Sequence, residues 1–281
     1  MDERLMNVND GGGTRLRTVL ICHHEDLLDR VGLAGWLASF SDLAGIVELS
    51  ETRQRMSRRI KREMKRVGAA RFLDVLAFRL YYRLFLARRD EDWRAQKLNE
   101  LSARHTLPAD VRVLRTHSPN APEAESFIRE LRPDLMVARC KTLLKESVFT
   151  IPKRGTFVMH PGVCPEYRNA HGCFWALARG DRERVGMTLL RIDRGVDTGP
   201  VFGYYSYPFD EAAESHAVIQ ARVVFDNLDA LRRKLLEIHA GEAEPVDTKG
   251  RASGEWGQPW LTSYLGWKRR ARRARARVRE A

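Results

Sequence analysis

Residues 160–197 constrain this chain more than any other stretch of it. His160 directly follows the apolar, β-type run 156–159, and Asp197 lies in a turn flanked by Gly195 and Gly199. A histidine beside a carboxylate is a common acid/base pair, because the imidazole titrates near neutral pH and the carboxylate tunes it. We therefore predict that the fold brings His160 and Asp197 together as catalytic residues.

Short apolar runs alternate with helical patterns along the chain, which is typical of a doubly wound, mostly parallel α/β sheet. Helical patterns cover residues 27–40, 121–131 and 211–239. Because open α/β sheets bind ligands at the carboxyl ends of their strands, His160 lies at a binding edge. The predicted strands are residues 18–22, 45–49, 111–114, 135–138 and 156–159.

We divide the chain into three parts. Residues 1–15 are polar and glycine-rich, which predicts a disordered lead-in. Residues 16–245 form the α/β domain, with a helical insertion at about 52–105 between the second and third strands. Residues 246–281 form a C-terminal extension in which tryptophans and a tyrosine precede an arginine-rich end.

The net charge of +12 is concentrated in two segments. Residues 53–66 and 268–281 each carry eight Lys or Arg and one Glu, so together they contribute +14 and the rest of the chain −2. Next to the first segment, an apolar helix over 72–86 has Arg79 and Arg83 on one face. These features indicate either a solvated helical hairpin that covers a sheet edge or a surface that docks on anionic lipid or on a large acidic substrate.

The C-terminal extension allows three interpretations. Its aromatic residues pack on the body and leave a disordered basic end, or they lie at an anionic membrane surface, or they stack on nucleic acid. We rank lipid ahead of nucleic acid. The chain has no C-x-x-C motif, no run of roughly 18 apolar residues and no secretory signal. We therefore expect a cytoplasmic protein, peripheral at the inner face of the membrane in the lipid interpretation.

Several short motifs recur in a fixed order around the predicted catalytic pair. At these motifs the chain resembles the formyltransferase family, the folate-dependent enzymes that include the methionyl-tRNA, glycinamide ribonucleotide and sugar N-formyltransferases. The resemblance extends weakly over residues 16–245. The motifs are His160-Pro161-Gly162, Pro165-Glu166-Tyr167-Arg168-Asn169, Trp175-Ala176-Leu177 with Gly180, Gly186-Met187-Thr188 and Asp197-Thr198-Gly199.

The resemblance implies a Rossmann-like formyltransferase fold and transfer of a formyl group from 10-formyltetrahydrofolate to an amine of a small molecule, sugar or lipid-linked acceptor. His160 would be the acid/base and Asp197 its assistant. Little sequence follows residue 245, so we do not expect tRNA as the acceptor. The implied substrate-binding residues are Tyr167, Arg168, Asn169 and His171, and the implied cofactor-binding residues are Cys140, Lys141, Leu143 and Leu144.

One residue departs from the family pattern. Val158 occupies the position of an asparagine that in the family donates a hydrogen bond to the formyl oxygen. Loss of one such donor costs roughly 2.7–4 kcal/mol of transition-state stabilisation. Asn169 is either a relocated amide donor or a turn or helix-cap residue.

Two other function classes remain open. A hydrolase of a formyl or acyl amide would use His160 and Asp197 on water, with a metal held by His23, His24, Glu25 or Asp26. A non-catalytic folate- or ligand-binding relative would have lost the chemistry with the asparagine at Val158. We predict no resident metal.

Overall fold

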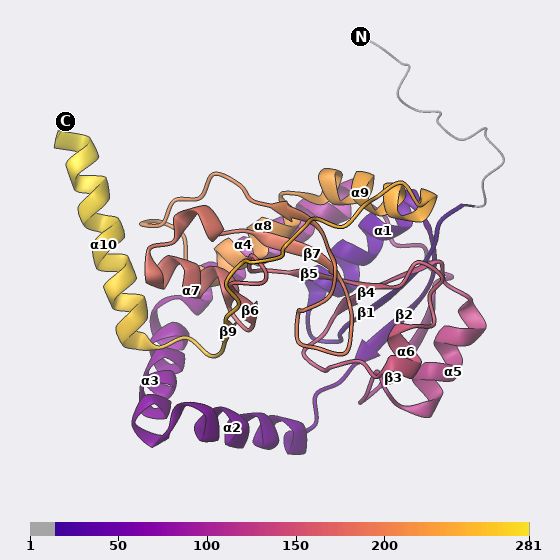
Figure 1. The fold of residues 1–281 in the computed structure, drawn as a ribbon, viewed down its shortest axis with the longest axis horizontal. Helices are drawn as coiled ribbons and strands as arrows, with labels where there is room; N and C mark the ends of the chain where they lie inside the picture. Colours follow the sequence, from indigo (N-terminus) through magenta and orange to yellow (C-terminus); the bar gives the residue numbers. More distant parts are fainter. Residues whose placement is uncertain (1–14, 281) are drawn as a thin grey trace, which may run out of the picture.

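The computed structural model describes residues 15–280, so the predicted lead-in falls almost entirely outside the described residues. At its centre is a seven-stranded sheet with the strand order β3-β2-β1-β4-β5-β7-β8 (Figure 1). The first five strands along the chain are parallel to one another, whereas β7 is antiparallel to both of its neighbours, β5 and β8. The strands are β1 (Arg17–His23), β2 (Asp42–Leu49), β3 (Arg112–Thr116), β4 (Leu135–Arg139), β5 (Thr156–His160), β7 (Met187–Arg191) and β8 (Val201–Tyr205).

This sheet confirms the predicted α/β fold, including all five predicted strands. Alternate side chains of β1 enter different cores, because successive residues of a strand point to opposite faces. Leu20 and Cys22 pack with the core that contains Trp36, whereas Val19 and Ile21 pack with the second core. Burial on both faces explains why the strand reads as a continuous apolar run.

The first core lies between the sheet and a layer of helices. A π-helical segment (Leu28–Leu33), α1 (Ala34–Phe40), α4 (Ala87–Arg104), α7 (Gly172–Arg179), α8 (His216–Phe225) and α9 (Leu228–Ala240) contribute to it. Helices α5 (Pro122–Leu131) and α6 (Glu146–Phe149) cover the opposite face. A 3₁₀ turn (Arg182–Arg184) joins α7 to β7.

The predicted long helix over 211–239 is instead the two helices α8 and α9. Asp226 and Asn227 break it, and the Asn227 side chain donates to the Ser206 and Val223 carbonyls in place of a continued helix. This competition between a short amide side chain and the backbone is the usual reason that asparagine ends helices. The chain therefore changes direction between α8 and α9.

The insertion contains three helices, so the prediction of a two-helix hairpin was wrong. Helix α2 (Arg53–Val67) and α3 (Ala69–Phe85) are separated by Gly68, which adopts a left-handed φ of 79°. Helix α4 returns to the body and packs on the π-helical segment and α8, not on an edge of the sheet. Val75 and Phe78 are the buried residues on the inner side of α3.

The C-terminal extension is anchored, not disordered. It forms the short strand β9 (Glu255–Trp256), which pairs with β6 (Arg168–Asn169), and the helix α10 (Leu261–Glu280). Trp267 is fully buried and its indole N–H donates to Glu211 at 2.8 Å. A buried tryptophan of this size fixes the helix on the body, which overturns the interpretation of a loose tail.

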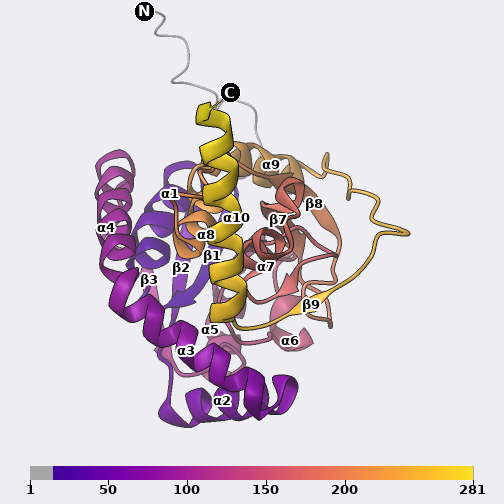
Figure 2. The same cartoon turned by 90° about the vertical axis from the view of Figure 1, so that its left-hand side faces the viewer.

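Helices α2, α3 and α10 lie together on one side of the molecule, and we call this side the helical face (Figure 2). Helix α3 packs on both of the others. The start of α10 is tied to α3, because Asp74 accepts a hydrogen bond from the Thr262 backbone N–H at 3.1 Å. No helix among residues 15–280 is long and apolar enough to cross a membrane.

Candidate active site

His160 and Asp197 meet at the carboxyl end of β5. The Nδ1 atom of His160 lies 3.4 Å from the Oδ2 atom of Asp197, and Nε2 lies 2.9 Å from the Tyr167 carbonyl oxygen. Both side chains are largely buried. Each ring nitrogen therefore faces an oxygen acceptor, an arrangement that an imidazolium with two N–H donors satisfies completely. The predicted proximity of the pair is present in the structure.

The loop after β5 is packed too closely for side chains. A Cβ added to Gly162 would lie 2.7 Å from the His160 Nε2 atom and 2.4 Å from the Tyr167 carbonyl oxygen. At Gly172, an added Cβ would lie 2.7 Å from the same carbonyl. Only glycine allows these two backbone segments to approach, and their approach places the carbonyl that orients the imidazole.

Two residues in left-handed backbone conformations hold the carboxylate. Asn169 has a φ of 76° and Asp197 a φ of 50°. The Asn169 backbone N–H donates to the Asp197 Oδ2 atom at 2.8 Å. A left-handed conformation in a non-glycine residue costs on the order of 1–3 kcal/mol, and such residues cluster at functional sites. The strain at both positions here is offset by a bond that orients the predicted catalytic carboxylate.

The side chain of Asn169 points away from His160. Its Nδ2 atom donates to the Trp256 carbonyl at 2.7 Å and to Glu255 at 3.2 Å, so both amide hydrogens are engaged by β9. The relocated-donor interpretation is therefore wrong for this conformation. The cap interpretation is wrong as well, because His171 precedes the first residue of α7.

Arg168 braces the turn that carries Asp197. Its Nη1 atom donates to the Val196 carbonyl at 2.8 Å and its Nε atom to the Ser253 hydroxyl at 3.0 Å. The guanidinium is thus bound to two different segments of the protein, one of them adjacent to Asp197. This placement gives Arg168 a role in positioning the carboxylate.

Tyr167 is a structural residue and not the predicted substrate contact. The side chain is buried, its hydroxyl donates to Asp181 at 2.9 Å, and its ring stacks on Trp256. Burial raises the pKa of the Tyr167 phenol to about 12. Its backbone carbonyl, rather than its ring, serves the site.

His171 lies in a second cluster beside the catalytic pair. Burial lowers the pKa of His171 to about 4, with the charge of Lys141 acting in the same direction. Its ring lies 5.9 Å from that of His216, which is enclosed by Phe78 and Phe174. Burial also lowers the pKa of His216 well below its ordinary value. The cluster is therefore neutral at physiological pH.

This cluster contains unsatisfied polar atoms. The Nε2 atom of Gln220 lies 3.4 Å from the His171 Nδ1 atom. The Oε1 atom of Gln220 and the Nδ1 atom of His216 have no hydrogen-bond partner among the described residues. Buried atoms of this kind usually bind water or a ligand. His171 was expected from the sequence. His216 and Gln220 were not, because their positions in an ordinary helical pattern give no indication of a binding role.

The predicted cofactor loop exposes two side chains and partly buries two. Lys141 and Leu143 are exposed, whereas Cys140 and Leu144 pack against the second core. The Lys141 backbone N–H donates to the His23 Nε2 atom at 3.3 Å. The loop therefore offers an apolar side chain and a cation next to the site, which fits a flat ring with attached carboxylates. Cys140 and Leu144 attach this loop to the second core.

The position of Val158 is apolar in the structure. Val158 pairs with Leu190 across the sheet and packs with Cys164, Val201 and Tyr204. The position shares the strand face of His160, two residues away. An amide at this position would face the same side as the imidazole but would enter an apolar patch.

Two of the four residues proposed for a metal are paired with other groups. His24 lies 2.7 Å from Glu48, and Asp26 accepts two hydrogen bonds from Arg94. Over residues 15–280, no group of three or more His, Cys, Asp or Glu side chains is arranged to hold a metal ion.

Arg139, at the end of β4, directly precedes the predicted cofactor loop and donates hydrogen bonds to two other segments. Its Nη1 atom donates to the Met159 carbonyl at 2.7 Å, and its Nε atom donates to the buried Asp29 at 3.1 Å. Burial raises the pKa of the Asp29 carboxyl, and the Arg139 guanidinium partly offsets that effect. This pair joins β4 to the residue immediately before His160.

The chain is similar to known proteins over the segment that contains this site. A family model described as formyl transferase matches residues 88–235, which is just over half of the chain. The methionyl-tRNA formyltransferase of Geobacter metallireducens is 32% identical over 139 residues, covering 47% of this chain and 43% of the relative. That of Xylella fastidiosa strain M23 is 31% identical over 183 residues, covering 62% and 58%. The chain thus spans about half the length of these curated relatives.

Solved structures show the same fold. A sugar N-formyltransferase from Shewanella sp FDAARGOS_354 has a TM-score of 0.52 and 11% identity, covering 90% of this chain and 86% of the other. The phosphoribosylglycinamide formyltransferase from Anaplasma phagocytophilum has a TM-score of 0.52 and 13% identity, covering 88% and 100%. Because the family match includes His160, Asp197 and most of the strands that place them, the chain belongs to the formyl transferase family.

Proposed function

We propose that this protein transfers a formyl group from 10-formyltetrahydrofolate to an amine of a small molecule, sugar or lipid-linked acceptor. The observation that carries the proposal is the 3.4 Å approach of His160 to Asp197 at the sheet edge, within the segment that matches the family. Folate, when bound, supplies the formyl carbon. Leu143 and Lys141 are the exposed groups that would contact it.

The reaction exchanges one carbon–nitrogen bond for another. The acceptor nitrogen forms a bond to the formyl carbon, the bond from that carbon to N10 of the folate breaks, and one proton moves from the acceptor to N10. His160 provides the proton relay, since it is the titratable group held between two oxygen acceptors. Asp197 stabilises the positive charge that develops on the imidazole or the amine.

The charge on the formyl oxygen requires a second group. Val158 cannot donate a hydrogen bond, and the Asn169 amide is engaged by β9. An imidazolium at His160 becomes a donor to the oxyanion when its Nε2–H is released from the Tyr167 carbonyl, so it would stabilise the oxyanion before it transfers the proton. We therefore propose that His160 performs both tasks and that transfer is slower than with an amide donor.

The neighbouring cluster favours acceptor binding. Gln220 and His216 have buried polar atoms without a partner among the described residues, next to His171 and close to the catalytic loop. Neutral histidines and a carboxamide bind hydroxyl and amine groups by hydrogen bonds. We propose that this cluster orients the acceptor, which is the kind of contact a sugar offers.

The direct experiment combines the purified protein, 10-formyltetrahydrofolate and panels of amino sugars, small amines and lipid-linked amines. Mass spectrometry should find an acceptor that gains one formyl group while tetrahydrofolate appears in equal amount. Formate release that does not depend on any acceptor would support the hydrolase alternative. Folate binding with no turnover on any panel would support the non-catalytic alternative. Absence of both folate binding and turnover would overturn the proposal.

A further inference from the structure

The helical face has an exposed leucine stripe that the proposed chemistry does not use. Leu73, Leu80 and Leu84 of α3 are 66%, 59% and 64% exposed, and Leu76 lies between them on the same face. The spacing places these side chains on one side of the helix, opposite the buried Val75 and Phe78. A stripe of this length on one helix is unusual, because soluble surfaces rarely expose contiguous apolar patches.

Basic residues are concentrated on the two helices that pack on α3. Helix α2 carries eight Lys or Arg and one Glu, and α10 carries the same numbers. On α3 itself, Arg79 and Arg83 are exposed beside the leucines, and its only acidic residue, Asp74, is bonded to Thr262. Exposed leucines bordered by cations are the composition of helices that lie in an anionic membrane interface.

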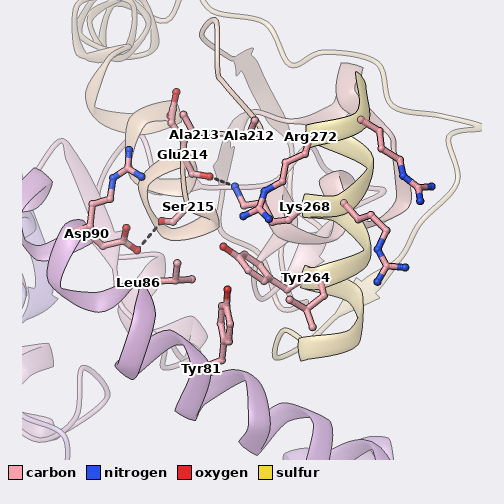
Figure 3. A pocket seen from close by; sticks show the side chains of 14 residues that line it. Tyr81, Leu86, Asp90, Ala212, Ala213, Glu214, Ser215, Tyr264, Lys268 and Arg272 are labelled. Atoms are coloured by element: carbon pink, nitrogen blue, oxygen red, sulfur yellow. Dashed lines mark hydrogen bonds between the residues drawn. The ribbon is translucent and has the colours of Figure 1, made fainter. Parts of the chain in front are cut away.

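Next to the stripe, a cavity of about 430 Å³ opens between α3, α4 and α10 (Figure 3). The hydroxyls of Tyr81 and Tyr264 point into it, and Leu265 of α10 adds an exposed apolar side chain at its wall. Tyr81 also contacts the exposed Phe85 at the end of α3, with ring centroids 5.0 Å apart. The cavity and the apolar surface of α3 are therefore continuous.

The cavity has more cationic than anionic lining groups. Arg89, Arg269, Arg272 and Arg273 line it, and among the described residues none of them has an ion-pair partner. The acidic groups at the wall are already bound: Asp90 accepts from the Ser215 hydroxyl at 2.7 Å, and Glu214 is paired with Arg222. Lys268 donates to the Glu211 and Glu214 carbonyls. The lining thus leaves four guanidinium groups for an anion.

We propose that the helical face docks on an anionic phospholipid surface, with the leucine stripe in the interface and a lipid headgroup phosphate in the cavity. Guanidinium groups bind phosphate oxygens in pairs of parallel hydrogen bonds, which suits four arginines around one cavity. The extension's aromatic residues do not form a stacking platform for nucleic acid, because Tyr264 and Trp267 are buried and Trp256 stacks on Trp175. Lipid is therefore the occupant that both observations fit.

Docking would place the active site near the membrane. The inner side of α3 contacts the acceptor cluster directly, since Phe78 lies 5.1 Å from His216 and 5.9 Å from Phe174 between ring centroids. The docking itself does not depend on the transferase activity, and its test measures binding alone.

The test is vesicle flotation of the full chain at low salt, with phosphatidylcholine vesicles that contain or lack phosphatidylglycerol. Wild type should float only with the anionic vesicles, and binding should fade as salt rises. The double variant Leu80→Glu with Leu84→Glu should bind at least about tenfold more weakly. Leu236→Glu, on the exposed side of α9, is the matched control and should bind as wild type does.

A second pair of variants tests the cavity. Arg272→Gln and Arg277→Gln each remove one charge from α10, but only Arg272 lines the cavity. Arg277→Gln should weaken binding about fivefold or less, which is the general effect of one surface charge, and Arg272→Gln should weaken it clearly more. Equal losses would overturn the headgroup assignment. Wild type that ignores anionic vesicles, or that binds RNA in their place, would overturn the docking proposal.

Discussion

The catalytic edge, formed by His160, Asp197, Arg168 and Asn169, and the helical face use charged residues in opposite ways. At the catalytic edge each charged side chain is fixed by a defined partner, as Arg168 is by the Val196 carbonyl. On the helical face, arginines such as Arg272 have no ion-pair partner among the described residues, and leucines are exposed beside them. Charged side chains with fixed partners hold the geometry that catalysis needs, whereas charged side chains without ion-pair partners can interact favourably with an external anionic partner.

The largest expected effect comes from breaking the catalytic edge. His160→Asn and Asp197→Asn should each lower formyl transfer by about 10²–10⁴-fold, because each removes a group used in proton transfer and leaves similar volume. Circular dichroism and thermal melting should stay close to wild type, since neither residue belongs to the apolar cores. A rate within tenfold of wild type for Asp197→Asn would show that the carboxylate has no catalytic part.

Trp267→Ala tests whether the helical face is an integral part of the fold. Trp267 is fully buried and bonded to Glu211, so its truncation should destabilise the protein by about 3–5 kcal/mol. Urea denaturation should detect this as a lower midpoint. Arg277→Gln, on the exposed side of the same helix, should leave the midpoint unchanged. An unchanged midpoint in Trp267→Ala would mean that α10 is not anchored as described.

Val158→Asn sharpens the comparison within the catalytic edge. A new amide on the strand face of His160 should raise formyl transfer about tenfold or more, because one oxyanion donor contributes on that scale. Stability should fall by about 1–3 kcal/mol, since the amide enters the apolar patch around Leu190. Single-turnover rates with bound folate measure the first effect. A folded, folate-bound variant with an unchanged rate would indicate that the oxyanion is held elsewhere.

The smallest expected effect concerns the buried histidines. The pKa of His171 is lowered to about 4 and that of His216 is also lowered, so the unfolded chain takes up protons below about pH 6.5 that the folded chain does not. Their contribution to stability is present above pH 6.5 and is lost as the pH falls toward 4, at up to about 1.4 kcal/mol per pH unit for each histidine.

The unfolded chain takes up one proton at each of these two histidines, and His216→Phe should remove one of these uptakes. The variant keeps an aromatic ring among Phe78 and Phe174 and loses the Nδ1 atom that lacks a partner among the described residues. Urea midpoints at pH 7 and pH 5 should therefore differ less in the variant than in wild type. A larger difference in the variant would mean that His216 is protonated in the folded protein.

The two regions also differ in how far the sequence predicts them. The apolar runs locate β1 to β5, and the motifs around His160 and Asp197 locate the catalytic pair, because both depend on short local patterns. The third helix of the insertion and the break between α8 and α9 were missed. Each depends on a tertiary contact or on one side chain, such as Asn227, competing for backbone groups.

Roles at the site that depend on the fold were predicted incompletely. Tyr167 matches the motif, yet its ring is structural and its carbonyl orients His160. Gln220 and His216 occupy unremarkable helical positions, and only the fold brings them to His171. The basic segments were visible as charge, but the exposed stripe and the cavity depend on which side of α3 and α10 is buried.

The most direct measurement crosses the two regions in one set of variants. Formyl transfer to a soluble acceptor and flotation with anionic vesicles would be measured for wild type, Asp197→Asn and Leu80→Glu with Leu84→Glu. Asp197→Asn is expected to lose transfer and keep vesicle binding, whereas the double leucine variant is expected to keep transfer and lose vesicle binding. Loss of both properties together in either folded variant would contradict the separation of a fixed catalytic edge from a binding face.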